Sequence, residues 1–288
     1  MKRKMISAVL CTAMVVTTMA GAAVTVSAEE KEPRKFAYTC MDGTNPFFVT
    51  IEDAIRKAVE ANGDELISTD PANDASLQIT QIEDMIAQGI DGIFLNPVEA
   101  EGILPALDAL KEADVPIVNF DTEVADLTYV ASYTGSDNYN AGKVCGFLDA
   151  IEGHNFEIVA QQDAKGNLET SMGIAEDLLQ AHSDVVAIFG GNDPTALGAL
   201  AAANAAGLEK GKCLIYGVDG SPDIKAEIAS GESLIEGSGA QSPIAIAEKS
   251  VEIMYDIMDG KEVDDRYPVD TFLITADNVE EYGTDGWQ

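Results

Sequence analysis

The sequence predicts an α/β fold in which mostly parallel sheets are covered by helices on both faces. From Lys35 onward, short and nearly continuous apolar runs alternate with helical patterns, which is typical of parallel strands buried on both sides. Polar pairs such as Asn96-Pro97 and Asp121-Thr122 follow several of these runs, and ligands of open α/β sheets bind beyond the carboxyl ends of strands. The chain has 288 residues, of which 46% are hydrophobic and 23% charged, enough for one large core or two medium ones.

Strands are predicted where an apolar run is bounded by polar residues or by turn-forming residues. In chain order they are Phe36–Cys40, Leu66–Thr69, Gly92–Leu95, Ile117–Phe120, Tyr129–Ala131, Glu157–Ala160, Ala187–Phe189, Leu214–Val218, Ser233–Gly237 and Thr271–Ile274.

Helices are predicted between these strands, where apolar residues recur at a spacing of three or four. In the first helix Phe47, Ile51, Ile55 and Val59 form one stripe, and Asn62-Gly63 ends it. The other apolar stripes run through Ile79–Ile86, Leu104–Leu110, Met172–Leu179, Ala196–Ala206 and Ile244–Met258.

The N-terminus has the pattern of a secretory signal peptide. The basic residues Lys2, Arg3 and Lys4 precede an uncharged stretch that ends in Val26-Ser27-Ala28, with the small residues that signal peptidase requires. The stretch is long enough for an uncleaved membrane anchor, but Thr, Ser, Ala and Gly dilute its second half and favour cleavage after Ala28. We therefore predict that residues 1–28 are a signal peptide and that the protein is exported to the periplasm or the extracellular face of the cell envelope.

The composition excludes several classes of partner and site. With 17 Lys+Arg against 50 Asp+Glu, the net charge is −33, which repels nucleic acid and anionic lipid. Two histidines and four scattered cysteines leave little for a zinc site, so neither a metal nor a cofactor is predicted. Cys40, Cys145 and Cys213 show no disulfide spacing, and Cys40 and Cys213 are expected to be small buried hydrophobes.

Six polar segments occur in an order and spacing that resemble one family. They are Thr44–Phe48, Pro116–Asp121, Ser136–Lys143, Gly191–Ala199, Tyr216–Asp223 and Ala240–Pro243. In these segments the chain resembles the periplasmic sugar-binding proteins of the ribose-binding type, which are the substrate-binding components of bacterial ABC importers. The resemblance covers nearly all of residues 35–275 and agrees with a signal peptide.

The resemblance implies the periplasmic-binding-protein type I fold, in which two α/β lobes are joined by a three-stranded hinge. The crossings are expected near Ser132–Asn138, Gly237–Gln241 and Pro268–Thr275. The N-terminal lobe would then comprise residues 35–135 and 241–270, and the C-terminal lobe residues 136–240. Residues 271–288 would form the last hinge strand and a tail.

A sugar presents hydroxyl groups around a ring with apolar C–H faces, so its site needs carboxylates, amides and aromatic rings. The ligand-binding residues that the resemblance implies are Asn45, Phe47, Phe48, Asp121, Ser136, Asn192, Asp219 and Gln241. Phe47 and Phe48 could instead belong to the core, since Phe47 aligns with Ile51. Asp193 and Asp223 are expected to cap helices, and Trp287 to be a packing or tail residue.

The sequence departs from the family at three places. Thr122 stands where an Arg usually follows the strand-end Asp, and the segment Gln162–Asn167 lacks the usual aromatic residue. After Gly146, roughly thirty residues are missing, about one strand–helix unit, and with them a second Arg. The C-terminal lobe is therefore expected to be shortened. Because both Arg positions are lost, the ligand is expected to be neutral or to carry an amine, and not to be an anion.

The predicted function is capture of a monosaccharide or related polyol between the lobes and delivery to the membrane permease of an ABC transporter, by a monomer and without catalysis. A chemoreceptor is a partner that the resemblance leaves open. One alternative is a binding-impaired paralogue or deletion variant of the same family. Another is a secreted carbohydrate-active enzyme, in which strand-end Asp residues would act as acid and base. The sensor domain of a sugar-responsive repressor is disfavoured, because a signal peptide stands where its basic DNA-binding segment would be.

Overall fold

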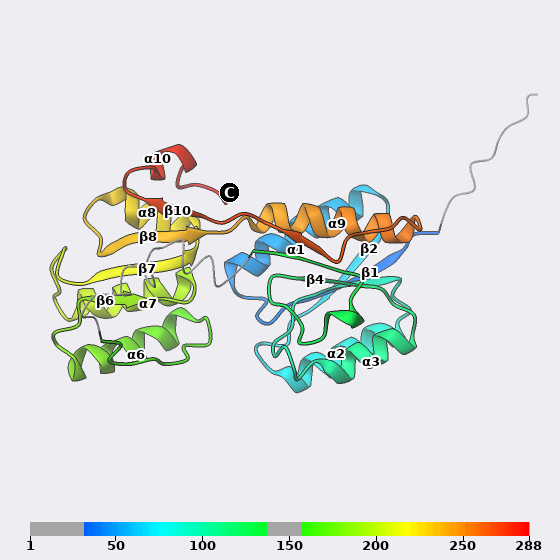
Figure 1. Ribbon diagram of the computed structural model, residues 1–288, viewed down its shortest axis with the longest axis horizontal. Helices are drawn as coiled ribbons and strands as arrows, with labels where there is room; N and C mark the ends of the chain where they lie inside the picture. The colour runs from blue at the N-terminus through cyan, green and yellow to red at the C-terminus, as the bar shows by residue number, and fades with distance from the viewer. Residues whose placement is uncertain (1–31, 137–156, 288) are drawn as a thin grey trace, which may run out of the picture. The chain divides into compact units, whose positions relative to one another are not determined.

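The computed structural model describes residues 32–136 and 157–287, and from Pro33 onward these belong to a single compact unit. Within this unit the chain forms two sheets with helices packed against them (Figure 1). The predicted signal peptide, residues 1–28, lies outside the described residues, as do Cys145 and Gly146. Among the helices of the described residues, none is both long and apolar enough to cross a membrane.

The first sheet has six parallel strands in the order β2-β1-β3-β4-β5-β9. They are β1 (Lys35–Thr39), β2 (Glu65–Thr69), β3 (Gly92–Leu95), β4 (Ile117–Phe120), β5 (Ser132–Gly135) and β9 (Arg266–Pro268). Parallel neighbours need a crossover between them, and most of these crossovers are helical. The helices of this part of the chain are α1 (Pro46–Ala61), α2 (Ala75–Ala87), α3 (Leu104–Glu112) and α9 (Pro243–Met258), with the short 3₁₀ helix η1 (Leu127–Tyr129).

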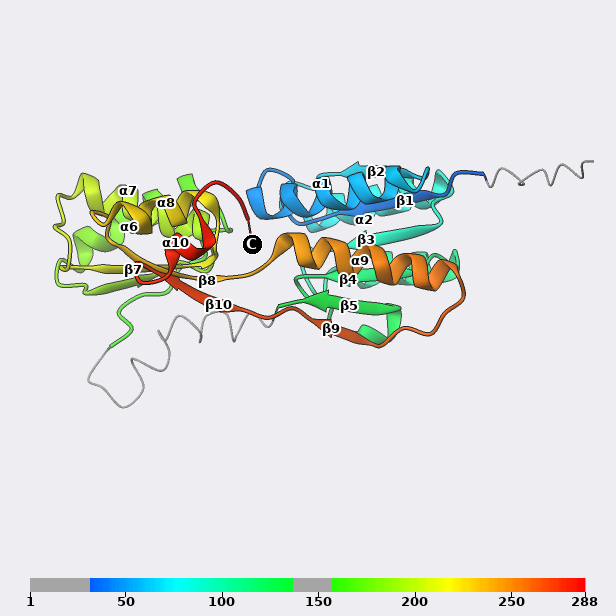
Figure 2. The same ribbon diagram turned by 90° about the horizontal axis from the view of Figure 1, so that it is seen from above.

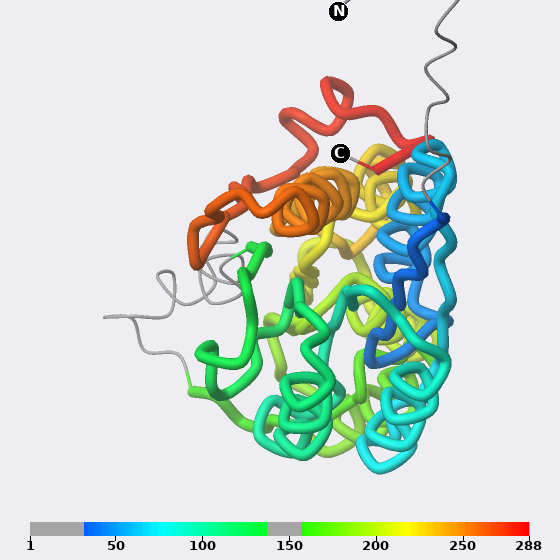
Figure 3. The backbone as a smooth tube through the Cα atoms, turned by 90° about the vertical axis from the view of Figure 1, so that its right-hand side faces the viewer, coloured from blue at the N-terminus to red at the C-terminus, as the bar shows by residue number. Residues whose placement is uncertain are grey.

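Alternating side chains of β1 explain why helices cover both faces of this sheet. Phe36 and Tyr38 are buried in a core with residues of α1 and α9, whereas Ala37 is buried in a separate core with residues of α2 and α3. Successive residues of a strand point to opposite faces, so the two helix pairs lie on opposite sides of the sheet (Figures 1 and 3). This is the layered α/β arrangement that the sequence predicts.

The second sheet has four strands in the order β10-β8-β7-β6, with β10 antiparallel to β8 and the other pairs parallel. They are β6 (Ala187–Phe189), β7 (Leu214–Asp219), β8 (Ile235–Ala240) and β10 (Phe272–Thr275). Its helices are α6 (Leu168–Ala181), α7 (Asp193–Ala205), α8 (Pro222–Ser230) and α10 (Val279–Tyr282). Alanines of α7 and the isoleucines of β7 and α8 form its core.

The chain passes from one sheet to the other three times. The first passage follows β5 and falls partly outside the described residues. The second runs from β8 into α9, which packs in the core of the first sheet, and the third runs from β9 to β10 (Figure 2). The strand order of each sheet thus draws on segments that are far apart in sequence.

Two predicted strands are wrong. Tyr129–Ala131 is not a strand, because Asp126 accepts a hydrogen bond from the backbone N–H of Thr128 and starts η1; the strand begins only at Ser132. Glu157–Ala160 is also not a strand: its Ile158 side chain is 67% exposed, and no strand of the described residues lies beside it.

The prediction also missed four elements of the described residues, namely η1, α8, β9 and α10. Strand β9 contains a proline and lies at the edge of the first sheet, where the sequence is polar. Helix α8 is short and has only Ile224 and Ile228 as apolar anchors. The remaining predicted strands and helices are found close to their expected bounds. Cys40 and Cys213 are buried and free, as predicted.

Candidate functional site

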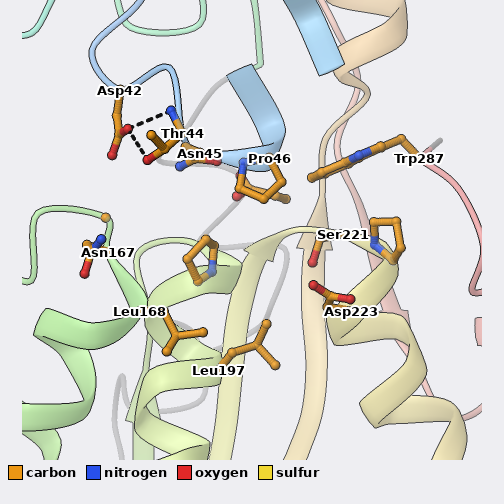
Figure 4. A pocket seen from close by; sticks show the side chains of 14 residues that line it. Asp42, Thr44, Asn45, Pro46, Asn167, Leu168, Leu197, Ser221, Asp223 and Trp287 are labelled. Atoms are coloured by element: carbon orange, nitrogen blue, oxygen red, sulfur yellow. Dashed lines mark hydrogen bonds between the residues drawn. The ribbon is translucent and has the colours of Figure 1, made fainter. Parts of the chain in front are cut away.

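A cavity of about 360 Å³ lies at the carboxyl ends of strands from both sheets. Its volume is at the low end of the range of roughly 300–1,000 Å³ that is usual for small-molecule sites. The lining residues are Asp42, Thr44, Asn45, Pro46, Gly166, Asn167, Leu168, Pro194, Leu197, Asp219, Ser221, Pro222, Asp223 and Trp287. Figure 4 shows the loop before α1 facing the starts of α6, α7 and α8, with Trp287 reaching in from the C-terminal tail.

The loop before α1 is shaped by its own side chains. Asp42 Oδ1 accepts hydrogen bonds from the backbone N–H (2.9 Å) and the hydroxyl (2.6 Å) of Thr44. Asn45 is the N-cap of α1, and its Oδ1 accepts from the N–H of Phe47 at 2.9 Å. Capping uses the oxygen of Asn45, and the Nδ2 group donates no hydrogen bond to the described residues.

Phe47 and Phe48 are both buried, at 3% and 4% exposure, and neither lines the cavity. The Phe48 ring meets Phe120 at 6.5 Å in the core of the first sheet. The Phe47 ring meets the edge of Trp287 at 5.9 Å and 71°. The core interpretation therefore describes both rings, since Phe47 and Phe48 belong to the same buried core. Trp287 lines the cavity and packs against that core, as expected of a packing residue.

Asp121 follows β4 with φ of 59° and is 8% exposed. Its Oδ2 accepts from Asn96 Nδ2 at 3.2 Å and from the Thr122 hydroxyl at 3.1 Å, and its carbonyl oxygen accepts from the Tyr133 hydroxyl at 2.7 Å. The position where the family usually has an Arg thus supplies a hydroxyl that holds the carboxylate. Ser136, beyond β5, is 3% exposed, and its Oγ has no hydrogen-bond partner in the described residues.

Asp219 ends β7 and lines the cavity with only 5% exposure. Gln241 Nε2 donates to its Oδ1 at 3.1 Å, while Gln241 Oε1 is buried without a partner in the described residues. Burial raises the pKa of Asp219 well above its usual range, and repulsion by the carboxylates of Asp193 and Asp121 raises it further. Carboxylates from the two sheets therefore interact electrostatically.

The prediction that Asp193 caps a helix is wrong. Asn192 is the N-cap of α7, whereas Asp193 is fully buried and accepts from the Ser221 N–H at 2.6 Å and the Ser238 hydroxyl at 2.7 Å. Burial raises its pKa to about 7. Asp193 thus joins the starts of α7 and α8 to β8. Asp223 is not a cap either: Ser221 caps α8, and Asp223 lies in its first turn and lines the cavity.

Asn192 does not line the cavity, and both ends of its side chain are hydrogen-bonded elsewhere. Oδ1 accepts from the Thr195 N–H at 3.0 Å, and Nδ2 donates to the Gly166 carbonyl at 3.1 Å. The second bond fixes the loop that leads to Asn167 and Leu168, two lining residues that the sequence interpretation missed. Their signal was the Asn that starts a helical stripe, as an N-cap does.

Of the eight residues proposed from the sequence, Asn45 and Asp219 line the cavity itself. Gln241 contacts Asp219, and Asp121 is near enough to raise its pKa. Among residues 32–136 and 157–287, no group of three or more His, Cys, Asp or Glu side chains could hold a metal ion.

The family described as periplasmic binding protein domain matches residues 36–148 and 145–262. The chain belongs to this family. The Haemophilus influenzae ribose import binding protein RbsB is 30% identical over 295 residues, which cover 92% of this chain and 98% of that protein. RbsB of Escherichia coli K12 is 29% identical over 281 residues, covering 87% and 93%.

Solved structures show the same fold. An ABC transporter solute-binding protein from Mycobacterium smegmatis with bound glycerol has a TM-score of 0.81 at 24% identity, covering 86% of this chain and 96% of that one. One from Bacillus halodurans with bound myo-inositol has a TM-score of 0.78 at 22% identity, covering 86% and 96%. The predicted two-lobed type I periplasmic binding fold is therefore confirmed.

Family membership also decides the class of function. The protein is an extracytoplasmic sugar-binding component of an ABC importer, and it is not an enzyme, since the family binds its solutes without transforming them. The predicted class and location are thus confirmed. The alternatives of a carbohydrate-active enzyme and of an impaired paralogue are not favoured.

Proposed function

We propose that the protein captures a monosaccharide or polyol in the cavity at the carboxyl ends of β1 and β7 and delivers it to a membrane permease. The observation that carries this proposal is the pair of nearly buried carboxylates, Asp121 and Asp219, which come from different sheets and repel each other. A ligand that donates hydroxyl protons to both relieves that repulsion. The relatives that bind ribose and myo-inositol support this class of ligand.

The proposed hydroxyl contacts are Asp121, Asp219, Gln241 and Asn45. Gln241 Oε1 and Asn45 Nδ2 are an acceptor and a donor that have no partner in the described residues, so a polyol can engage them. Each hydrogen bond to a carboxylate contributes about 1.5–3 kcal/mol. Hydrogen bonds to the neutral amides of Gln241 and Asn45 contribute about 0.5–1.5 kcal/mol each. At the upper end of these values, two contacts of each kind reach the free energy of micromolar binding, which is about 8 kcal/mol.

For the other predicted contacts the geometry supports different roles. Ser136 is proposed as a further hydroxyl contact, because its Oγ is buried without a partner in the described residues. Phe47 supports the lining residue Trp287 from behind, Phe48 packs against Phe120 in the core, and Asn192 positions the loop before α6.

We also propose that the two lobes have the predicted bounds and that the second lobe has lost a segment after Gly146. The two matched stretches of the family meet at residues 145–148. The alignment to the E. coli relative runs over 281 residues yet takes in only 87% of this 288-residue chain, so that relative has residues without a counterpart here. Buried residues such as Ala196, Ala203 and Ile215 support a second core that still closes.

The test is calorimetric titration of the exported, purified protein with D-ribose, D-allose, myo-inositol and glycerol, followed by thermal melts. Binding of one of these with a Kd in the micromolar range or below, together with a rise in Tm, is the expected result. A cooperative melt with no binding to any of a wider set of pentoses, hexoses and polyols would refute the proposal. We also propose that the protein is a monomer, which sedimentation of the same sample tests. A chemoreceptor is proposed as a further partner of the sugar-bound protein.

A further inference from the structure

The C-terminal tail brings the only tryptophan of the sequence into the cavity. Trp287 lines it together with Asn45, Pro46 and Asp219, and Figure 4 shows the indole reaching from the tail toward Pro46. Behind it, the Phe47 ring meets the indole edge-on at 5.9 Å and 71°, a favourable geometry for two aromatic rings. The tail follows β10 and α10 of the second sheet, whereas Asn45, Pro46 and Phe47 stand at the start of α1.

A buried lysine fixes the tail at the neighbouring residue. Lys225 of α8 has no exposed surface, and its Nζ donates to the carbonyl oxygen of Gly286 at 2.6 Å. Burial lowers the pKa of Lys225, and the carboxylates of Asp285 and Asp193 oppose that shift. Burying an ammonium group is costly unless it is hydrogen-bonded or paired. The hydrogen bond from Lys225 to the Gly286 carbonyl therefore gives the tail a defined position.

The rest of the lining explains what an indole adds there. The other lining residues are polar or acidic, with prolines, Gly166, Leu168 and Leu197, and Trp287 is the only aromatic residue among them. A sugar or polyol ring has apolar C–H faces. A flat aromatic ring is well suited to bury such a face from water.

We propose that Trp287 is the aromatic platform for the ligand and that residues 283–287, fixed by Lys225, form a strap that determines specificity. This inference rests on the proposed function. It assigns ligand contact to the tail in addition to the loops at the strand ends, and it makes Lys225 a positioning residue.

The test uses the fact that Trp287 is the sole indole. The wild-type protein is titrated with D-ribose, D-allose and myo-inositol by calorimetry, and the tryptophan emission is recorded in the same samples. We expect saturation to shift the emission and to protect the indole from acrylamide quenching. Trp287→Ala is expected to weaken binding about tenfold, whereas Trp287→Phe retains most of the affinity. Lys225→Met, which keeps the apolar stem, is expected to weaken binding and to increase quenching of Trp287 in the free protein.

The matched control is Tyr129→Ala, which removes a half-buried aromatic ring outside the cavity and is expected to leave affinity unchanged. If the wild type binds a sugar but Trp287→Ala binds equally well, the inference is overturned and the proposed function stands. If Trp287→Ala does not fold, the wild type alone decides. The inference is then overturned if saturation with the sugar changes neither the tryptophan emission nor its quenching by acrylamide. If the wild type melts cooperatively but binds none of the wider set of pentoses, hexoses and polyols, both fail together.

Discussion

Replacing Asp193 by Asn should change how the stability of the protein depends on pH. The Asp193 carboxylate is fully buried and accepts hydrogen bonds from the Ser221 N–H and the Ser238 hydroxyl. An Asn side chain has the same shape, can accept from Ser221 through Oδ1 and can donate to Ser238 Oγ through Nδ2. The substitution therefore removes the titrating group while it preserves the connection between α7, α8 and β8.

The sign follows from burial, which raises the pKa of Asp193 from 3.8 to about 7. The folded protein then binds a proton more tightly than the unfolded chain, so this stabilisation is complete below pH 3.8 and is lost as the pH rises through 7. The full difference is worth about 4 kcal/mol at 1.36 kcal/mol for each pH unit. Asp219, whose pKa is also raised, acts in the same direction.

The assay is urea unfolding at pH 5, 6, 7 and 8, with ligand absent. We expect the free energy of unfolding of the wild type to fall over this range, and that of Asp193→Asn to fall less. Between pH 5 and 8 the difference between the variant and the wild type should change in favour of the variant by about 1–3 kcal/mol, which is the part of the total of about 4 kcal/mol that falls in this range. Asp177→Asn, which removes an exposed carboxylate of α6, controls for the relief of the net charge of −33. Parallel curves for the wild type and Asp193→Asn would refute the reasoning.

Two further predictions concern the cavity, and a third concerns the cap of α7. Asp219→Asn is expected to weaken sugar binding by about tenfold or more in calorimetry, because an NH₂ donor replaces one of the two carboxyl oxygens that can accept from a sugar hydroxyl; an unchanged Kd would contradict the proposed contact. Ribose 5-phosphate and gluconate are expected not to bind, since the lining has Asp42, Asp219 and Asp223 but no Lys or Arg, and helix N-termini carry only partial positive charge; a complex with either would show otherwise. Asn192→Ala is expected to lower the free energy of unfolding by about 1 kcal/mol through loss of the α7 cap, and chemical denaturation at constant pH measures it.

The fold was predictable where local pattern and tertiary environment agree. Gly92–Leu95, Ile117–Phe120 and Ala187–Phe189 are found with their predicted bounds, because short apolar runs between helical stripes have few alternatives to a parallel strand. Glu157–Ala160 has the same pattern but lacks a neighbouring strand among the described residues, and pairing is a non-local condition that no single segment encodes. Strand β9 is the opposite case: its sequence is polar and does not predict a strand, but it pairs with β5 at the edge of the sheet.

The candidate site was predictable to the extent that it follows strand ends. Asp121 and Asp219 were identifiable because each follows a buried strand, and both have positive φ, which the turn at that edge requires. Trp287 had no such signal. The neighbouring Gly286 accepts a hydrogen bond from Lys225, which is 61 residues away along the chain. The complete burial of this lysine is not indicated by its sequence neighbours.

The same geometry explains which predicted contacts are available to a ligand. The oxygen of a side chain that caps a helix accepts from a backbone N–H, as in Asn45 and Asn192. The amide NH₂ of Asn192 is engaged as well, because it donates to the Gly166 carbonyl. Side chains at strand ends are under no such demand, and Gln241 Oε1 is left buried without a partner in the described residues. A buried polar atom of this kind is costly until something donates to it. Ligand affinity should therefore depend more on Asp219 and Gln241 than on the capping asparagines, although all of them stand in the segments that resemble the family.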